Sequence, residues 1–212
     1  MFLKSLLCLI SSTVSFSIYA QNENEGAKKI DLFTSFGVLY TNDIKFTNGS
    51  SDFGLELSLS GLYSFPSLKS VTPVIGGGLH SSVFTKKLSQ DAISIILPHD
   101  SELNVSWASL EANAGVKLNP IAKLNLFTLV NLGYAPLTKT TFGNSNFEIG
   151  STSKNHSYYG ATVIGTVPLT EAMSIGGSFT YNRHNMSSKK IIGKTISFIN
   201  QYTTALVLQF SI

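Results

Sequence analysis

Apolar and polar side chains alternate along short segments of the chain from residue 30 onward. The clearest segment is "FGLELSLSGLYSF", which runs from Phe53 to Phe65. One set of alternate positions carries leucine and aromatic side chains, and the other carries glycine, glutamate and serine, with Leu62 as the apolar exception. Because successive side chains of a strand point to opposite sides, this pattern predicts a strand with one apolar and one polar face.

The same pattern divides the chain into eight predicted strands, and no stretch of useful length has the helical period. The predicted strands cover residues 30–40, 53–65, 73–84, 103–118, 124–136, 158–167, 173–183 and 194–212. In the fourth strand the apolar phase changes between Trp107 and Leu110. That change predicts a β-bulge or a long strand that leaves the bilayer.

The predicted connections alternate between short and long. Those after the second, fourth and sixth strands are short, whereas the other four are longer and polar, covering residues 41–52, 85–102, 137–157 and 184–193. A closed meander with tight turns at one rim and long loops at the other gives this alternation. The sequence therefore predicts an all-β protein, an eight-stranded antiparallel up-and-down transmembrane β-barrel.

Composition supports a membrane barrel. Charged residues make up only 13% of the chain and apolar residues 43%, yet beyond the N-terminus no apolar run has the roughly 20 residues that a membrane helix needs. A sheet in hydrocarbon must close, since every backbone polar group has to be paired internally. The alternative is a secreted, lipocalin-like binding barrel, in which the apolar face would point inward.

The first 20 residues, "MFLKSLLCLISSTVSFSIYA", have the charge, apolar centre and small-residue end of a secretory signal peptide. We therefore divide the chain into a signal peptide (1–20), a flexible polar leader (21–29) and a β-barrel (30–212). The only cysteine, Cys8, lies in the signal peptide. The formal net charge of +3 gives no reason to expect a nucleic-acid partner.

The chain after residue 29 resembles the small eight-stranded outer-membrane barrels of Gram-negative bacteria, of the OmpA transmembrane-domain and OmpX type. The resemblance rests on the signal peptide, the eight amphipathic strands, the alternating connections and the ending "YTTALVLQFSI", in which Ile212 replaces the usual final aromatic residue. It implies an outer-membrane location, contact with outer-membrane lipid and lipopolysaccharide, and recognition of the last strand by the barrel-assembly machinery. We expect a monomer whose four extracellular loops serve envelope integrity or adhesion.

Several residues are candidates for chemistry in such a barrel. Four ionisable residues on neighbouring predicted strands would form a polar cluster in the lumen: Glu56, His80, Glu111 and Lys117. An ion pair there would be a structural plug, or alternatively part of a narrow channel. Four lysines at or beyond the outer ends of the third and seventh strands would contact lipopolysaccharide phosphates: Lys86, Lys87, Lys189 and Lys190.

A lipid A-modifying enzyme is another alternative. His184 with Ser187, and His156 with Ser157, are neighbouring nucleophile and base types in predicted polar loops, but no carboxylate is evident to orient either histidine. We therefore assign no catalytic residue, and no spacing predicts a metal or other cofactor. Aromatic residues near segment ends suit interfacial girdles: Tyr40, Phe53, Tyr63, Phe65, Trp107, Tyr134, Tyr159, Tyr181 and Tyr202.

Overall fold

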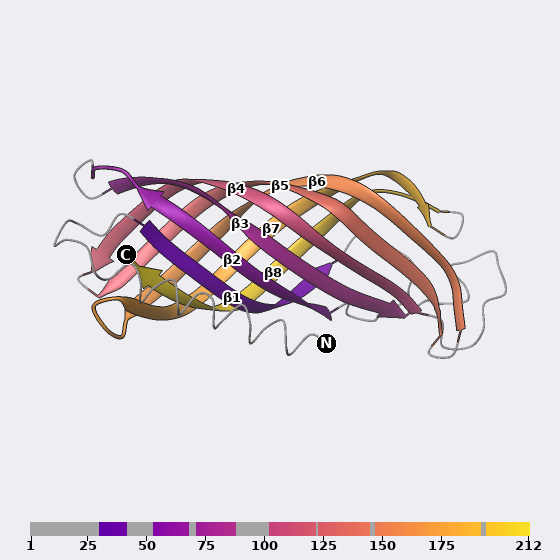
Figure 1. Ribbon diagram of the computed structural model, residues 1–212, viewed down its shortest axis with the longest axis horizontal. Helices are drawn as coiled ribbons and strands as arrows, with labels where there is room; N and C mark the ends of the chain where they lie inside the picture. Colours follow the sequence, from indigo (N-terminus) through magenta and orange to yellow (C-terminus); the bar gives the residue numbers. More distant parts are fainter. Residues whose placement is uncertain are drawn as a thin grey trace.

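The computed structural model is a closed antiparallel barrel in which each strand pairs with the next and β1 pairs with β8 (Figure 1). It describes residues 30–41, 53–67, 71–87, 102–121, 123–144, 147–191 and 194–212. Side chains of residues 86–87, 120–121, 142–144, 147–154, 187–191 and 194–197 lie outside this description, as do the predicted signal peptide and leader. The strands are β1 (Ile30–Thr41), β2 (Phe53–Ser64), β3 (Val71–Lys87), β4 (Glu102–Ile121), β5 (Leu124–Asn144), β6 (Phe147–Pro168), β7 (Met173–Ile191) and β8 (Lys194–Ser211).

The described residues include no helix long and apolar enough to cross a membrane.

The two ends of the barrel sequence meet at the β1–β8 seam. The Ile30 amide donates to the Ile212 carbonyl at 3.0 Å, and the Ile212 amide donates to the Ile30 carbonyl at 2.9 Å. From there the ladder continues through pairs such as Phe36 with Leu206. Both edge strands are therefore paired, and the fold class predicted from the alternation is confirmed.

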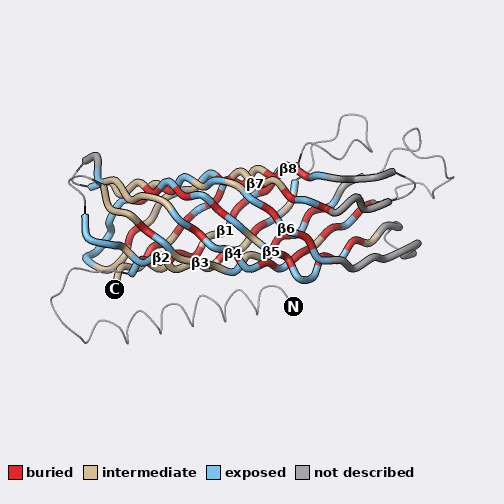
Figure 2. The backbone as a smooth tube through the Cα atoms, turned by 90° about the horizontal axis from the view of Figure 1, so that it is seen from above, coloured by how far each residue is buried: buried red, intermediate tan, exposed pale blue. Residues whose placement is uncertain are grey.

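Buried and exposed positions alternate along the strands, as the bands of colour in Figure 2 show. In β2, Phe53 and Leu55 are exposed on the outer surface, whereas Glu56 and Ser58 are buried inside. Leu62, the apolar exception on the polar face, is fully buried in the interior. In β8 the outward-facing Leu206 is 61% exposed. Large apolar side chains thus cover the outside of the barrel.

The interior holds two apolar clusters separated by polar side chains. Both clusters draw on residues of many strands, which converge because alternate positions of every strand point to the barrel axis. The cluster nearer the β1–β2 and β3–β4 connections contains Leu39, Phe84, Leu103, Val105, Trp107, Ala135, Met186 and Ile199. The cluster nearer the chain ends contains Phe33, Leu62, Val74, Phe127, Leu129, Ile164 and Val207.

The strands β5, β6 and β7 are longer than the sequence pattern predicts. The connections after β5 and β7 consist of residues 145–146 and 192–193 only, so the predicted alternation of connection lengths is wrong at these two positions. Thr138 and Thr140 are buried on the inner face of β5. The sequence of these extensions is mostly polar, as in Thr138–Lys139–Thr140–Thr141 of β5, so it shows little of the apolar alternation by which a strand is recognised.

An irregularity lies where the sequence predicts it, between Trp107 and Leu110, but the bulged strand is β5 rather than β4. The β4–β5 register shifts between Ala108 and Leu110, but the extra residue belongs to β5, where Pro136 and Leu137 follow Ala135. A proline has no N–H to donate to the ladder and is tolerated at a bulge. The apparent change of apolar phase in β4 has another cause, which is that Trp107 packs inside the barrel.

Trp107 is therefore not a girdle residue. Only 4% of it is exposed, and its ring packs edge-on against Phe84 with centroids 5.6 Å apart. The prediction failed because an aromatic residue fits either face of a strand. The inner face of β4 changes character along the strand. It is apolar at Leu103, Val105 and Trp107 and polar at Ser109, Glu111 and Asn113.

Candidate functional site

The centre of the barrel interior contains an imidazole between two carboxylates. His80 on β3 lies between Glu56 on β2 and Glu111 on β4, because the register pairs Glu56 with Ser82 and Glu111 with Gly78, each two residues from His80. The His80 Nε2 atom is 3.1 Å from Oε1 of Glu111, and Nδ1 is 3.9 Å from Oε1 of Glu56. All three side chains are largely buried, so each charge depends on its neighbours for compensation.

Lys117, the fourth candidate, lies at a second ionic site. Its Nζ atom is 3.0 Å from Oδ2 of Asp31 and 5.1 Å from the centroid of the Phe127 ring. Oδ1 of Asp31 accepts hydrogen bonds from Gln209 at 2.8 Å and from Ser211 at 2.6 Å. This Asp31–Lys117 site lies near the chain ends, whereas Glu56, His80 and Glu111 lie near the middle of their strands.

A row of hydrogen bonds leads from Glu56 across the lumen. Nε2 of Gln201 donates to Oε2 of Glu56, and Oε1 of Gln201 is 2.8 Å from Nε2 of His184. Nδ1 of His184 is 2.8 Å from Nε2 of His156, whose Nδ1 is 2.6 Å from the Thr138 hydroxyl. Each member of the row comes from a different strand, in the order β2, β8, β7, β6 and β5.

The carboxylate of Glu56 sets the direction of this row. Since a carboxylate accepts hydrogen bonds, the Gln201 amide group faces it and leaves the Gln201 carbonyl for His184. A neutral His184 then carries its hydrogen on Nε2 and accepts at Nδ1 from His156, which in turn accepts from Thr138. Every group has a complementary partner with both histidines neutral, so the row requires no further charge.

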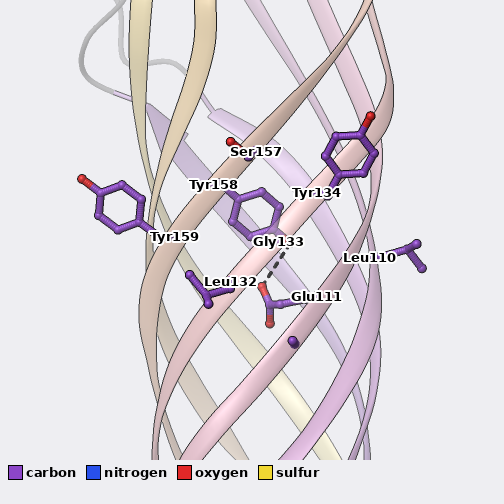
Figure 3. Close-up of a pocket in the computed structure, with 9 residues that line it drawn as sticks. Leu110, Glu111, Leu132, Gly133, Tyr134, Ser157, Tyr158 and Tyr159 are labelled. Atoms are coloured by element: carbon purple, nitrogen blue, oxygen red, sulfur yellow. Dashed lines mark hydrogen bonds between the residues drawn. The ribbon is translucent and has the colours of Figure 1, made fainter.

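Tyr158 joins the central site from β6. Its hydroxyl donates to Oε2 of Glu111 at 3.1 Å and also lies 3.1 Å from the Ser109 hydroxyl (Figure 3). Its ring lies across Gly133, which is its direct partner in β5. A Cβ at residue 133 would be 1.9 Å from the Tyr158 Cζ atom. The tyrosine reaches Glu111 because residue 133 has no side chain.

Aromatic rings hold the histidine pair in place. The Tyr158 ring stacks on His184 with centroids 4.7 Å apart, and Trp107 lies 4.9 Å from His184 and 5.7 Å from His156. These contacts place the pair between the central site and the apolar cluster that contains Trp107. The arrangement fixes the ring orientations that the hydrogen bonds require.

His156 and Ser157 do not form the arrangement of a nucleophile and its base. His156 is buried inside the barrel, whereas its neighbour Ser157 is exposed on the outer surface. His184 is likewise buried in the interior, and the side chain of Ser187 lies outside the described residues. The prediction that these histidines lie in polar loops is wrong for both, because β6 and β7 extend through them.

The four lysines proposed to contact lipopolysaccharide lie near the ends of β3 and β7. The backbone register pairs Lys86 with Leu103 and Lys87 with Glu102, and pairs Lys189 with Ile196 and Lys190 with Thr195. Their side chains lie outside the described residues, so their contact with lipopolysaccharide stays a prediction. Within the described part of the chain, no group of three or more metal-ligating side chains could hold a metal ion.

Sequence reasoning missed Gln201, His156, His184 and Tyr158 as members of the network. The phase of β8 contained a usable signal, since Gln201, Thr203 and Gln209 share the side opposite Leu206. For β6 and β7 the signal was absent. Polar residues such as asparagine and serine flank both histidines, which obscures the two faces of each strand.

No family model matches the chain, and no curated protein matches its sequence. Among solved structures it is similar to Neisserial surface protein A, NspA, with a TM-score of 0.53 and 11% identity over 89% of this chain and 100% of that one. A weaker similarity is to Ail, the attachment invasion locus protein of Yersinia pestis, with a TM-score of 0.46 and 11% identity over 88% and 100% of the two chains. The chain thus has the fold of the small eight-stranded outer-membrane barrels.

Proposed function

We propose that this protein is an integral outer-membrane barrel with a structural, surface-exposed role in envelope integrity or adhesion. The observation that carries the proposal is the distribution of side chains. Leu132, Val130 and Leu206 are each more than 60% exposed on the outside, while Glu56 and Gln209 are buried inside. A water-soluble barrel has the opposite arrangement, so the outer surface suits hydrocarbon.

The height of the apolar surface supports the same proposal. Exposed aromatic residues lie at both ends of it, represented on β2 by Phe53 and Tyr63. They are ten residues apart, and at about 3.3 Å per residue with a tilt of roughly 40° this separation corresponds to about 25 Å along the barrel axis. That is about the height of the apolar band of an outer-membrane barrel.

The row of aromatic residues that begins at Phe53 crosses four strands. Phe53, Tyr40, Tyr202 and Tyr181 pair directly across β2, β1, β8 and β7. Their ring centroids are 6.2, 6.4 and 5.3 Å apart in that order. Because the strands are tilted, this row descends along the barrel axis from Phe53, and followed around the barrel it reaches Tyr63. Phe53 and Tyr40, at its start, suit the level of lipid headgroups. The polar hairpins of β5–β6 and β7–β8 would then project beyond the membrane and be available to a partner.

The interior favours a structural role over conduction. Two apolar clusters fill the lumen on either side of the central site, and hydrogen bonds join Glu56 to Gln201, Gln201 to His184, and Tyr158 to Glu111 between them. An ion would have to displace these side chains, including the fully buried Phe33 and Phe127. A narrow channel is therefore the less favoured alternative. We keep the lipid A-modifying enzyme as an alternative without a catalytic residue to assign.

Single cysteines test the proposal directly, because Cys8 in the predicted signal peptide is the only cysteine of the chain. We expect the folded protein to fractionate with outer membranes and to show heat-modifiable mobility on gels. In vesicles, a fluorophore at Leu132→Cys should be quenched by brominated lipid, whereas one at Gln209→Cys should not. Solubility without detergent, or equal quenching at both positions, would contradict the proposal.

A further inference from the structure

An apolar groove lies on the outer surface of β4, β5 and β6. It has a volume of about 570 Å³, within the usual range for ligand-binding clefts. Figure 3 shows Leu110, Tyr134 and Tyr159 directed away from the barrel, while Glu111 and Tyr158 lie on the inner side of the wall. The outward-facing lining is completed by Ala112, Leu132 and Ser157.

The side of the groove towards β7 carries a cation. The strand register places Ala112, Leu132, Tyr159 and Arg183 in one continuous row across β4, β5, β6 and β7. Adjacent strands are about 4.8 Å apart, so Arg183 is about 10 Å from Leu132 along the row. Because Arg183 and Tyr159 are direct partners on the outer face, the cation borders the groove.

Among the described residues, the guanidinium of Arg183 has no anionic partner. Its Cζ atom lies 4.3 Å from the centroid of the Phe198 ring, a cation–π contact that fixes its direction. In the described part of the chain no ion pair joins it to a carboxylate, and its buried Nε atom has no hydrogen-bond acceptor. A guanidinium is well suited to bind phosphate oxygens with two parallel hydrogen bonds.

Hydroxyl and amide groups surround the same region. Nδ2 of Asn155 donates to the Tyr134 hydroxyl at 2.8 Å, which leaves the tyrosine hydrogen free to donate to another acceptor. Ser157 and Tyr159 are exposed beside it. The surface thus combines an apolar groove for an alkyl chain, a cation for a phosphate and hydroxyl groups for a sugar.

We propose that this surface binds a phosphorylated, multiply acylated glycolipid of the outer leaflet, with one acyl chain in the groove and a phosphate at Arg183. The proposal rests on the membrane location argued above and specifies the lipid that this part of the barrel selects. The choice of a glycolipid over a phospholipid follows from the position at the rim opposite the chain ends, together with the hydroxyl groups beside the cation.

The test measures lipid retention by the full-length mature protein in detergent micelles, using native mass spectrometry. The probes are bisphosphorylated lipid A, dephosphorylated lipid A and phosphatidylglycerol. We expect Arg183→Gln to weaken binding of bisphosphorylated lipid A about tenfold, the loss of one charge-assisted contact, and to leave binding of the dephosphorylated form unchanged. Lys123→Gln removes an exposed cation at the opposite rim and should have no effect.

A second pair of variants tests the groove. Ala112→Trp should fill it and reduce lipid A retention at least fivefold even though Arg183 is intact, whereas Ala114→Trp, one outward position along β4 and not part of the lining, should not. Each variant is first checked for heat-modifiable mobility, so that a misfolded barrel is recognised and excluded.

Equal retention of phosphatidylglycerol and lipid A would overturn the choice of lipid, and unchanged binding in Arg183→Gln would overturn the site. Either result, obtained with a folded barrel that fractionates with outer membranes, would leave the proposed location intact. Failure of the fractionation experiment itself would remove the basis of both proposals.

Discussion

The barrel interior contains two ionic sites that compensate buried charge in different ways. At the Asp31–Lys117 site, one carboxylate lies 3.0 Å from one ammonium. The other carboxylate oxygen accepts hydrogen bonds from Gln209 and Ser211. At the central site, two carboxylates share one imidazole, and neutral donors from Gln201, Thr203, Ser82 and Tyr158 supply the remaining hydrogen bonds. The first site balances its charges by pairing, and the second relies on a network that reaches most of the strands.

This difference indicates which site depends more strongly on a single residue. Loss of a cation from the matched pair leaves a carboxylate that keeps two donors. Loss of the imidazole from the central site leaves two carboxylates of the same sign in the interior. The stability of the barrel should therefore respond more strongly to a change at the centre than to one near the chain ends.

The largest effect is expected for His80→Leu. Removing one partner of a buried ionic group usually costs about 3–5 kcal/mol, and here the two glutamates lose their shared counter-charge. The measurement is the free energy of unfolding in urea of the barrel folded in detergent micelles. Adding Glu111→Gln to this variant should recover part of the loss, because one negative charge is then gone. A His80→Leu barrel as stable as the parent would mean that the imidazole carries no compensating charge.

An intermediate effect is expected for Gly133→Ala, which disturbs the central site through the barrel wall. A methyl group at residue 133 would overlap the Tyr158 ring, and displacing the ring would break the bond to Glu111. Overpacking and the lost hydrogen bond together should cost about 2–4 kcal/mol. Tyr158→Phe, which removes the hydroxyl alone, is the matched control and should cost less. If both variants unfold at the same urea concentration, the ring contact with Gly133 is unimportant.

The smallest effect is expected for Lys117→Met. Asp31 would keep its hydrogen bonds from Gln209 and Ser211, so the loss should be about 1–3 kcal/mol, below that of His80→Leu under the same conditions. Methionine retains most of the apolar stem that packs near Phe127. A loss larger than that of His80→Leu would reverse the ranking of the two sites.

The sequence predicts the strands well where one face is apolar and poorly where neither is. The bounds of β1 and β2 are within one residue of those predicted, because leucine and aromatic residues alternate there with small or polar ones. The predicted ends of β5 and β7 are eight residues short, since the threonines, serines and lysines beyond them show no apolar period. Tertiary pairing, rather than local pattern, makes those segments strands.

The candidate site could be predicted only in part for a similar reason. The inward direction of Glu56, His80 and Glu111 follows from strand phase, and so does their position on adjacent strands. Their level relative to Lys117 depends on the register between strands, which the sequence does not encode locally. Lys117 on β4 and Asp31 on β1 lie on strands that are not neighbours. They meet across the lumen because pairing of β1 with β8 closes the barrel.

That closure also has a kinetic consequence. Asp31 accepts hydrogen bonds from Gln209 and Ser211, partners that are separated from it by 178 and 180 residues. Contacts so distant in sequence form slowly and only after most of the chain has been ordered. A chain that lacks residues 209–211 does not contain them, so the hydrogen bonds of the seam to Asp31 cannot form in it. Closure of the seam therefore depends on Gln209 and Ser211, because without them Asp31 would lack two of the groups that it binds.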